Sequence, residues 1–204
     1  MTFRRTIVAI VVAIVVSGCA ALPEIPYDRM GAGEIKRIGL IPPSLPKSAS
    51  VILASSPGQS FGLVGAIVDA TLQARREGHF RMFLEDEHFS TQDVFTGRLK
   101  QQIEMQGYTV TTVNAIRSGP NFVTKFPMDS DVDAFLDVLV TNYGYISAGV
   151  GNDTPYRPQF LVQVRLIRAK DSAVLLQDTI VYNPYKIGPT AYDSRRREIG
   201  RAHV

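Results

Sequence analysis

The alternation of side chains near the end of the chain is the feature that most limits its fold. Between residues 160 and 166 apolar side chains occupy every even position, while Gln163 and Arg165 face the other way. This two-residue period is typical of a strand with one buried face. A second apolar segment, Val174 to Tyr182, follows the five-residue turn 169–173. The pattern therefore predicts a C-terminal antiparallel hairpin.

Two helices are predicted before this hairpin. Apolar residues recur at helical spacing from Ser60 to Arg76, and Gly78 is expected to end the first helix. The charged segment 81–89 that follows is interpreted as a loop. Ser90 then begins a sequence that resembles a capping box. Apolar residues at intervals of four continue from there to Gly107, which predicts a second amphipathic helix.

Four further segments have the composition of strands, and they are 35–41, 51–54, 108–113 and 134–146. Pro42 and Pro43 end the first of them, because proline lacks the N–H that a sheet requires. With helices early and a hairpin late, the chain is predicted to form an α/β (α+β) sandwich with a mixed sheet of about five strands and two main helices. A length of 204 residues suits a single domain, which we place at 34–185.

A row of small residues at intervals of four runs through the first predicted helix: Gly58, Gly62, Ala66 and Ala70. Such a row lets another element approach the helix closely. Tight packing on the protein's own sheet is the favoured interpretation. An interaction surface, for oligomer formation or membrane contact, is the alternative.

Three tyrosines form a second possible interaction surface. Tyr143 and Tyr145 lie in the longest predicted strand, 134–146, and Tyr156 precedes Pro158. Exposed aromatic side chains are common where proteins recognise partners. The glycines among them, Gly144, Gly149 and Gly151, are interpreted as a strand end or bulge, since no Gly-Lys-Ser/Thr sequence or following helix indicates a phosphate site.

No group of residues indicates catalysis. His79 and His88 flank the acidic residues 85–87 without a recognised metal spacing, so this segment is expected to be a solvated charged loop. Asp131 and Asp133 are expected to solubilise the beginning of a strand. No serine stands in a Gly-x-Ser-x-Gly setting. We therefore predict no catalytic residue, no metal site and no cofactor.

The beginning of the chain has the three parts of a secretory signal. A basic head is followed by ten apolar residues, 7–16, and by small residues before the only cysteine, Cys19. The sequence Val16-Ser17-Gly18-Cys19 resembles the lipobox of bacterial lipoproteins, in which the cysteine is acylated and becomes the new N-terminus. An ordinary signal peptide with a chance cysteine, or a buried first strand, is the alternative.

The lipobox resemblance implies a signal peptide at 1–18 and a membrane anchor of acyl chains, such as palmitate, on Cys19. Ala20 after the cysteine resembles the pattern that directs lipoproteins to the outer membrane of Gram-negative bacteria, facing the periplasm. Residues 19–33 are rich in Pro, Gly and Ala and are predicted to be a lipidated N-terminus with a flexible tether.

Residues 186–204 are predicted to be an irregular tail. Its last six residues, 199–204, resemble the translation of a common sequencing adapter and are interpreted as an artefact, with a genuine basic tail as the alternative. Residues 1–18 and 198–204 contain Arg4, Arg5, Arg201 and Glu198, so without them the formal charge falls from +3 to +1. The pI near 9.1 thus gives no reason to expect nucleic acid as a partner.

The order of these motifs is similar to that of a broad group of bacterial envelope lipoproteins that includes the curli-secretion lipoprotein. The resemblance rests on the lipobox, on the sequences 106–110 and 133–143, and on the hairpin 164–176. It implies a non-enzymatic accessory or assembly component of the cell envelope, which binds a protein partner or forms homo-oligomers. A carrier or sensor that binds a small lipid or glycan between the small-residue helix and the sheet is the alternative, and an enzyme is the third possibility.

Overall fold

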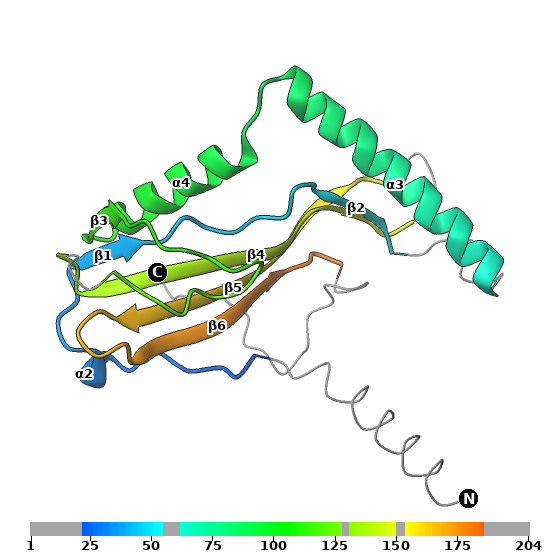
Figure 1. The fold of residues 1–204 in the computed structure, drawn as a ribbon. Helices are drawn as coiled ribbons and strands as arrows, with labels where there is room; N and C mark the ends of the chain where they lie inside the picture. The colour runs from blue at the N-terminus through cyan, green and yellow to red at the C-terminus, as the bar shows by residue number, and fades with distance from the viewer. Residues whose placement is uncertain (1–21, 55–61, 128–130, 150–153, 186–204) are drawn as a thin grey trace, which may run out of the picture.

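A computed structural model describes residues 22–54, 62–127, 131–149 and 154–185. These residues form three helices and six strands, which in chain order are α2 (Arg29–Ala32), β1 (Arg37–Leu40), β2 (Ser50–Leu53), α3 (Gly62–Asp86), α4 (Thr91–Met105), β3 (Thr109–Thr112), β4 (Ala134–Ser147), β5 (Arg157–Arg168) and β6 (Val174–Tyr182). The strands make one mixed sheet, and α3 and α4 form two arms of a V above it (Figure 1).

The order of strands is β3, β1, β4, β5, β6, and β2 pairs with the far half of β4. β1 runs parallel to β3 and to the beginning of β4, whereas β4, β5 and β6 are antiparallel neighbours. The α/β class, the mixed sheet and the C-terminal hairpin are as predicted. The sheet has six strands rather than five, because 14-residue β4 is long enough to pair with β1 at one end and β2 at the other.

Each face of the sheet has its own core. On one face Phe135 and Ile41 pack against Val123 and Val132 from the segment that connects β3 to β4. On the other face Val138, Val140 and Val162 pack beneath Phe95 and Leu99 of α4. The helices therefore cover one face of the sheet, and an irregular segment covers the other.

The helix predictions are correct in position and wrong in one boundary. Ser90 is the N-cap of α4, and its side chain accepts a hydrogen bond from the backbone N of Asp93 at 3.3 Å. α3, however, continues through Gly78 to Asp86, so most of the predicted loop at 81–89 is helix. A glycine inside a helix costs only about 1 kcal/mol, which the contacts of Glu77 and Phe80 with the sheet on either side of it offset.

The described residues include no helix that is both long and apolar enough to cross a bilayer. Within the segment predicted as a tether, Ile25 pairs with Gln177 of β6 through two backbone hydrogen bonds of 2.8 and 2.9 Å. The chain is thus held against the β6 edge of the sheet at Ile25.

Candidate functional site

The second half of α3 is fixed to the sheet by polar and aromatic contacts. One carboxylate oxygen of Glu77 accepts hydrogen bonds from the backbone N of Val51 in β2, at 3.3 Å, and from the side chain of Gln73, at 2.9 Å. One turn further on, Phe80 meets Tyr145 edge to face, with 5.4 Å between ring centroids. These contacts hold this half of the helix above β2 and β4.

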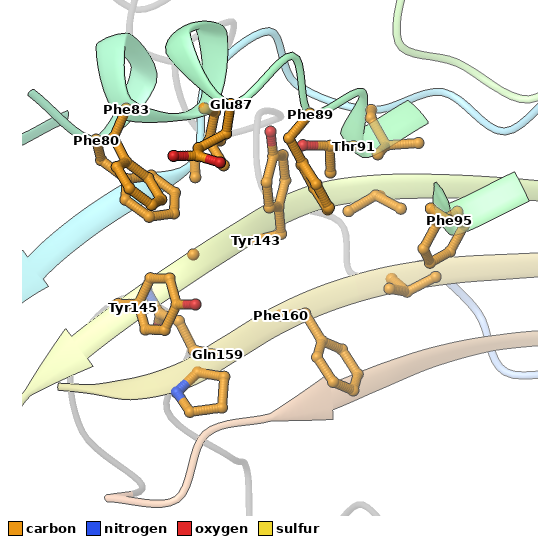
Figure 2. Close-up of a pocket in the computed structure, with 17 residues that line it drawn as sticks. Phe80, Phe83, Glu87, Phe89, Thr91, Phe95, Tyr143, Tyr145, Gln159 and Phe160 are labelled. Carbon is orange, nitrogen blue, oxygen red and sulfur yellow. The ribbon is translucent and has the colours of Figure 1, made fainter. Parts of the chain in front are cut away.

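A groove of about 620 Å³ lies between the helices and the sheet, where α3 gives way to α4. Its walls are mostly apolar. The aromatic and aliphatic side chains from the helices and the turn between them are Phe80, Phe83, Leu84, Phe89 and Phe95, and those from β4 and β5 are Val140, Tyr143, Tyr145, Phe160 and Val162 (Figure 2). This volume and this lining are typical of ligand sites, which usually measure about 300 to 1,000 Å³.

A β-bulge in β4 turns the two tyrosines into this groove. The pairing of β4 with β5 shifts between Val140 and Asn142, so the alternation of faces is offset by one residue. Val140 and Tyr143 consequently face the same side, and Tyr145 follows them. Without the bulge, strict alternation would place both tyrosines on the opposite face of the sheet.

Gly144, between these tyrosines, lets β2 approach β4 closely. Its φ is +146°, and a Cβ there would lie 2.0 Å from the backbone O of Ser50. Ser50 in turn donates from its hydroxyl to the side-chain oxygen of Asn142 at 2.8 Å and accepts from the side-chain nitrogen of Gln159 at 3.3 Å. The floor of the groove therefore contains a hydrogen-bonded polar group, Gln159, that is 1% exposed.

A second recess of about 320 Å³ opens from the same region and has a more polar lining than the groove. It shares six lining residues with the groove: Leu45, Ala49, Leu84, Phe89, Thr91 and Tyr143. It adds the charged residues Lys47, Arg81 and Glu85, and the Arg81 and Glu85 side chains approach to 3.7 Å. Glu87 is the charged residue among those that line the groove. The combined site thus has an apolar part and a part with charges of both signs.

The first half of α3 presents a stripe of large apolar side chains to solvent. Their exposed fractions are 79% for Leu63, 72% for Val64, 59% for Ile67, 52% for Val68 and 41% for Leu72. At 100° per residue this stripe lies on the side of the helix away from the side chains that contact the sheet in the second half. No rotation of α3 about its axis could bury both sides against the sheet.

The small-residue row does not pack as predicted. Ala66 and Ala70 are exposed, because the half of α3 that carries them extends beyond the contacts with β2. The prediction of tight packing on the protein's own sheet is therefore wrong for these two residues. Gly62 begins the helix, and Gly58 lies outside the described residues.

The predicted interaction residues do not form one surface. Tyr143 and Tyr145 line the groove, Tyr156 is 45% exposed before β5 and is not among the lining residues, and Ala66 and Ala70 lie on the first half of α3. The lipobox residues Val16, Ser17 and Gly18 and the acylation site Cys19 lie outside the described residues.

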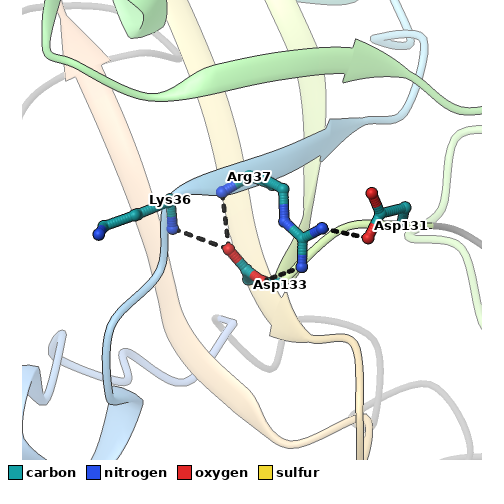
Figure 3. A network of polar contacts seen from close by, with 4 residues as sticks. All are labelled: Lys36, Arg37, Asp131 and Asp133. Atoms are coloured by element: carbon teal, nitrogen blue, oxygen red, sulfur yellow. Dashed lines mark hydrogen bonds and ion pairs between the residues drawn. The ribbon is translucent and has the colours of Figure 1, made fainter.

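Asp131 and Asp133 do more than solubilise a strand. The Asp133 carboxylate accepts from the backbone N of Lys36 and of Arg37, at 2.9 and 2.8 Å, and pairs with the Arg37 guanidinium at 2.9 Å (Figure 3). Asp131 pairs with the same guanidinium. The Arg37 hydrogen bond and the backbone N–H of Lys36 lower the pKa of Asp133 to about 2. This network ties the beginning of β4 to β1.

A buried ion pair lies on the face of the sheet away from the helices. Asp137 is 0% exposed and accepts from the guanidinium of Arg117 and from the backbone N of Val123, both at 2.7 Å. Arg117 also donates to the backbone O of Pro42 and Asn121, at 3.1 and 2.8 Å. These contacts hold the irregular segment 113–127 against the sheet.

Neither histidine of the predicted charged loop lines the groove or the recess. His79 lies on an exposed side of α3, and His88 lies in the turn after it with a φ of 51°. Within the four described ranges, no three His, Cys, Asp or Glu side chains are grouped so that they could hold a metal ion.

No protein-family model matches the chain, and no curated protein matches it. Among solved structures, the crystal structure of lipoprotein GNA1162 from Neisseria meningitidis is similar at 15% sequence identity and a TM-score of 0.25, over 78% of this chain and 86% of that one. A TM-score this low does not establish a shared fold. The resemblance to the curli-secretion group gains no support from these comparisons.

Proposed function

We propose that this protein is a non-enzymatic, lipid-anchored lipoprotein of the bacterial cell envelope that binds a protein partner through the first half of α3. The observation that carries the proposal is the exposed apolar stripe from Leu63 to Leu72, with fractions of 41% to 79%. Large contiguous apolar patches on a folded protein mark interaction surfaces. In this role the protein is an accessory or assembly component rather than a catalyst.

The composition of the stripe favours a protein partner over the membrane surface. Helices that lie in a membrane interface usually carry Lys and Arg on their polar face, which attract anionic lipids. Residues 62–74 contain no Lys or Arg, and their one charged residue is Asp69. A second apolar helix, from another protein or another copy of this chain, could cover the stripe without any need for basic residues beside it.

The beginning of the chain supports the anchor. In the proposed mature protein Cys19 is acylated and becomes the first residue, and Ile25, six residues later, is bonded to β6. Six residues extend over at most about 20 Å, so the anchor would hold the domain close to the membrane. The outer membrane facing the periplasm is the location that Ala20 favours.

The absence of a catalytic role is part of the proposal. No histidine or cysteine, two of the commonest catalytic side chains, is among the residues that line the groove. Gln159, a polar residue of its floor, is engaged in a structural hydrogen bond to Ser50.

Photocrosslinking in intact cells tests the partner surface. A photoreactive phenylalanine analogue at Ile67 of the full-length protein is expected to give a discrete protein adduct, whereas the same analogue at exposed Arg98 of α4 is not. Leu63→Glu should reduce the adduct by about tenfold, since it places a charge in an apolar interface. Ile116→Glu, at a residue that is 95% exposed and outside the stripe, is the matched control.

Equal labelling at the two positions, or adducts that contain only lipid, would contradict partner binding. The anchor is tested separately with Cys19→Ser, which should abolish acyl labelling and membrane association of the protein. A variant that keeps both would overturn the anchor.

A further inference from the structure

We propose that the groove and the polar recess together bind one single-chain phospholipid with a zwitterionic headgroup. The acyl chain lies in the groove between the helices and the sheet, and the headgroup lies in the recess beside Lys47, Arg81 and Glu85. This site is separate from the apolar stripe of α3, and the two proposals can fail independently.

The scarcity of polar groups in the groove determines which kind of molecule fits. An extended peptide would bring a backbone N–H and C=O with every residue, and each would need a partner once removed from water. Few lining residues of the groove offer one, and Gln159 is already bonded to Ser50. An acyl chain requires no hydrogen bonds, so it can enter this groove without that penalty.

The thickness of a helix also argues against a protein occupant. An α-helix with its side chains is about 10 to 12 Å across, so only a short piece of one would fit in a space of about 620 Å³. A single unbranched chain is thin enough to follow the groove past Phe80, Tyr145 and Phe160.

The charges of the recess determine the headgroup. Lys47 and Arg81 are cations, and Glu85 and Glu87 are anions, so the charged lining residues of the two spaces sum to zero. A fatty acid, with its single carboxylate, could pair with Lys47 or Arg81 but would offer no cation to Glu85 and Glu87. A headgroup with a phosphate and an ammonium can satisfy both signs, with the phosphate toward Lys47 and Arg81 and the ammonium toward the glutamates.

The two spaces are placed for one amphiphilic ligand. They share six lining residues, among them Tyr143, whose phenol oxygen points toward the turn between α3 and α4 (Figure 2). Two apolar side chains of the roof are also partly open to water, Phe83 at 57% and Phe89 at 46%. A chain in the groove would cover them.

Photolabelling of the full-length protein in phosphatidylcholine nanodiscs tests the site. The probe is a lysophosphatidylcholine with a photoreactive acyl chain. We expect labelled peptides to map to the segments that line the groove, which are residues 45–49, 80–95, 140–145 and 158–162. Phe83→Glu should reduce this labelling by about tenfold, because it places a charge against the chain. Phe83 is 57% exposed, so the variant should fold, which circular dichroism checks.

Ile116→Glu is the matched control and should label like the unaltered protein. A second variant, with Lys47→Glu and Arg81→Glu, should reduce labelling by the lysophosphatidylcholine probe but not by a monoacylglycerol probe of the same chain, which has no charge. Labelling that is spread evenly over the protein, or unaffected by Phe83→Glu, would overturn the site. If a diacyl probe labels the site as strongly as the lysophosphatidylcholine probe, the proposal of a single acyl chain is overturned. If the Lys47→Glu and Arg81→Glu variant loses labelling by the monoacylglycerol probe as well, the headgroup assignment is overturned.

Discussion

The two halves of α3 have continuous helical backbone and opposite relations to the rest of the protein. In the second half, Glu77 bonds to β2 and Phe80 packs on Tyr145. In the first half, Leu63 and Val64 are 79% and 72% exposed. The contrast teaches that contacts with the protein's own sheet hold the second half, although Met82 and Phe83 there are each 57% exposed. The apolar stripe of the first half is the surface on which the proposed partner would bind.

Loss of the buried ion pair is expected to lower the free energy of unfolding most, and to destabilise the whole domain rather than one half of α3. Arg117→Ala leaves Asp137, which is 0% exposed, without its cation and should lower the free energy of unfolding by about 3 kcal/mol. Urea unfolding of the full-length protein in detergent measures it. Lys100→Ala, which breaks an exposed pair with Glu104, should cost less than about 0.5 kcal/mol. Equal effects of the two variants would contradict the importance of the buried pair.

Truncation of one apolar residue in each half tests the contrast directly. Phe80→Ala removes the contact with Tyr145 and should cost about 2 kcal/mol, which is below the value for a fully buried phenylalanine because Phe80 is half-buried. Val64→Ala, at an exposed position, should stay within about 0.5 kcal/mol. The same urea experiment compares them, and similar losses would mean that both halves are packed.

Loss of the hydrogen bond between α3 and β2 should have a smaller effect on stability, and the change in hydrogen exchange should be confined to nearby amides. Glu77→Ala leaves the backbone N of Val51 without this acceptor and should cost about 1 kcal/mol. Hydrogen exchange should become faster at Val51 and in the second half of α3, and stay unchanged in the first half. Glu85→Ala, which breaks an exposed pair with Arg81, is the control. An exchange change confined to the first half would contradict the docking geometry.

Acid should weaken the sheet at the end remote from α3. The folded pKa of Asp133 is about 2 and its ordinary value is 3.8, so its contribution is present above pH 4 and is lost as the pH falls toward 2. Because the carboxylate is partly exposed, we expect that contribution to be about 1 kcal/mol. Asp133→Asn should flatten the stability profile in this window, measured by urea unfolding between pH 2 and 5. An unchanged profile would contradict the network with Arg37.

The sequence predicts those parts of the fold that depend on local patterns. The alternation from 160 to 166 and the cap at Ser90 have direct counterparts in β5 and α4. The boundary at Gly78 is wrong because the glycine penalty is small beside the packing of Phe80 on the sheet, which involves residues 65 positions apart.

The groove could not be predicted in the same way. Tyr143 and Tyr145 face it only because a bulge shifts the alternation after Val140. The glycines that indicate a strand end or bulge in the sequence begin at Gly144, after that point, so they do not locate the shift. Asp137 is a charged residue within an apolar strand, and its partner Arg117 lies 20 residues away in an irregular segment, so no local pattern pairs them. The exposure of Ala66 and Ala70 depends on where β2 ends, and the spacing of residues in a helix gives no information about that.

Hydrogen exchange along α3 tests most directly whether an external partner covers its first half. The full-length protein is measured alone in detergent and again in native membrane extract. Amides of residues 63–72 are predicted to exchange rapidly in the isolated protein and to become at least tenfold slower in the extract, a difference of about 1.4 kcal/mol. Amides of residues 77–86 should change little. Protection of the first half in the isolated protein, or identical exchange in both samples, would contradict the account.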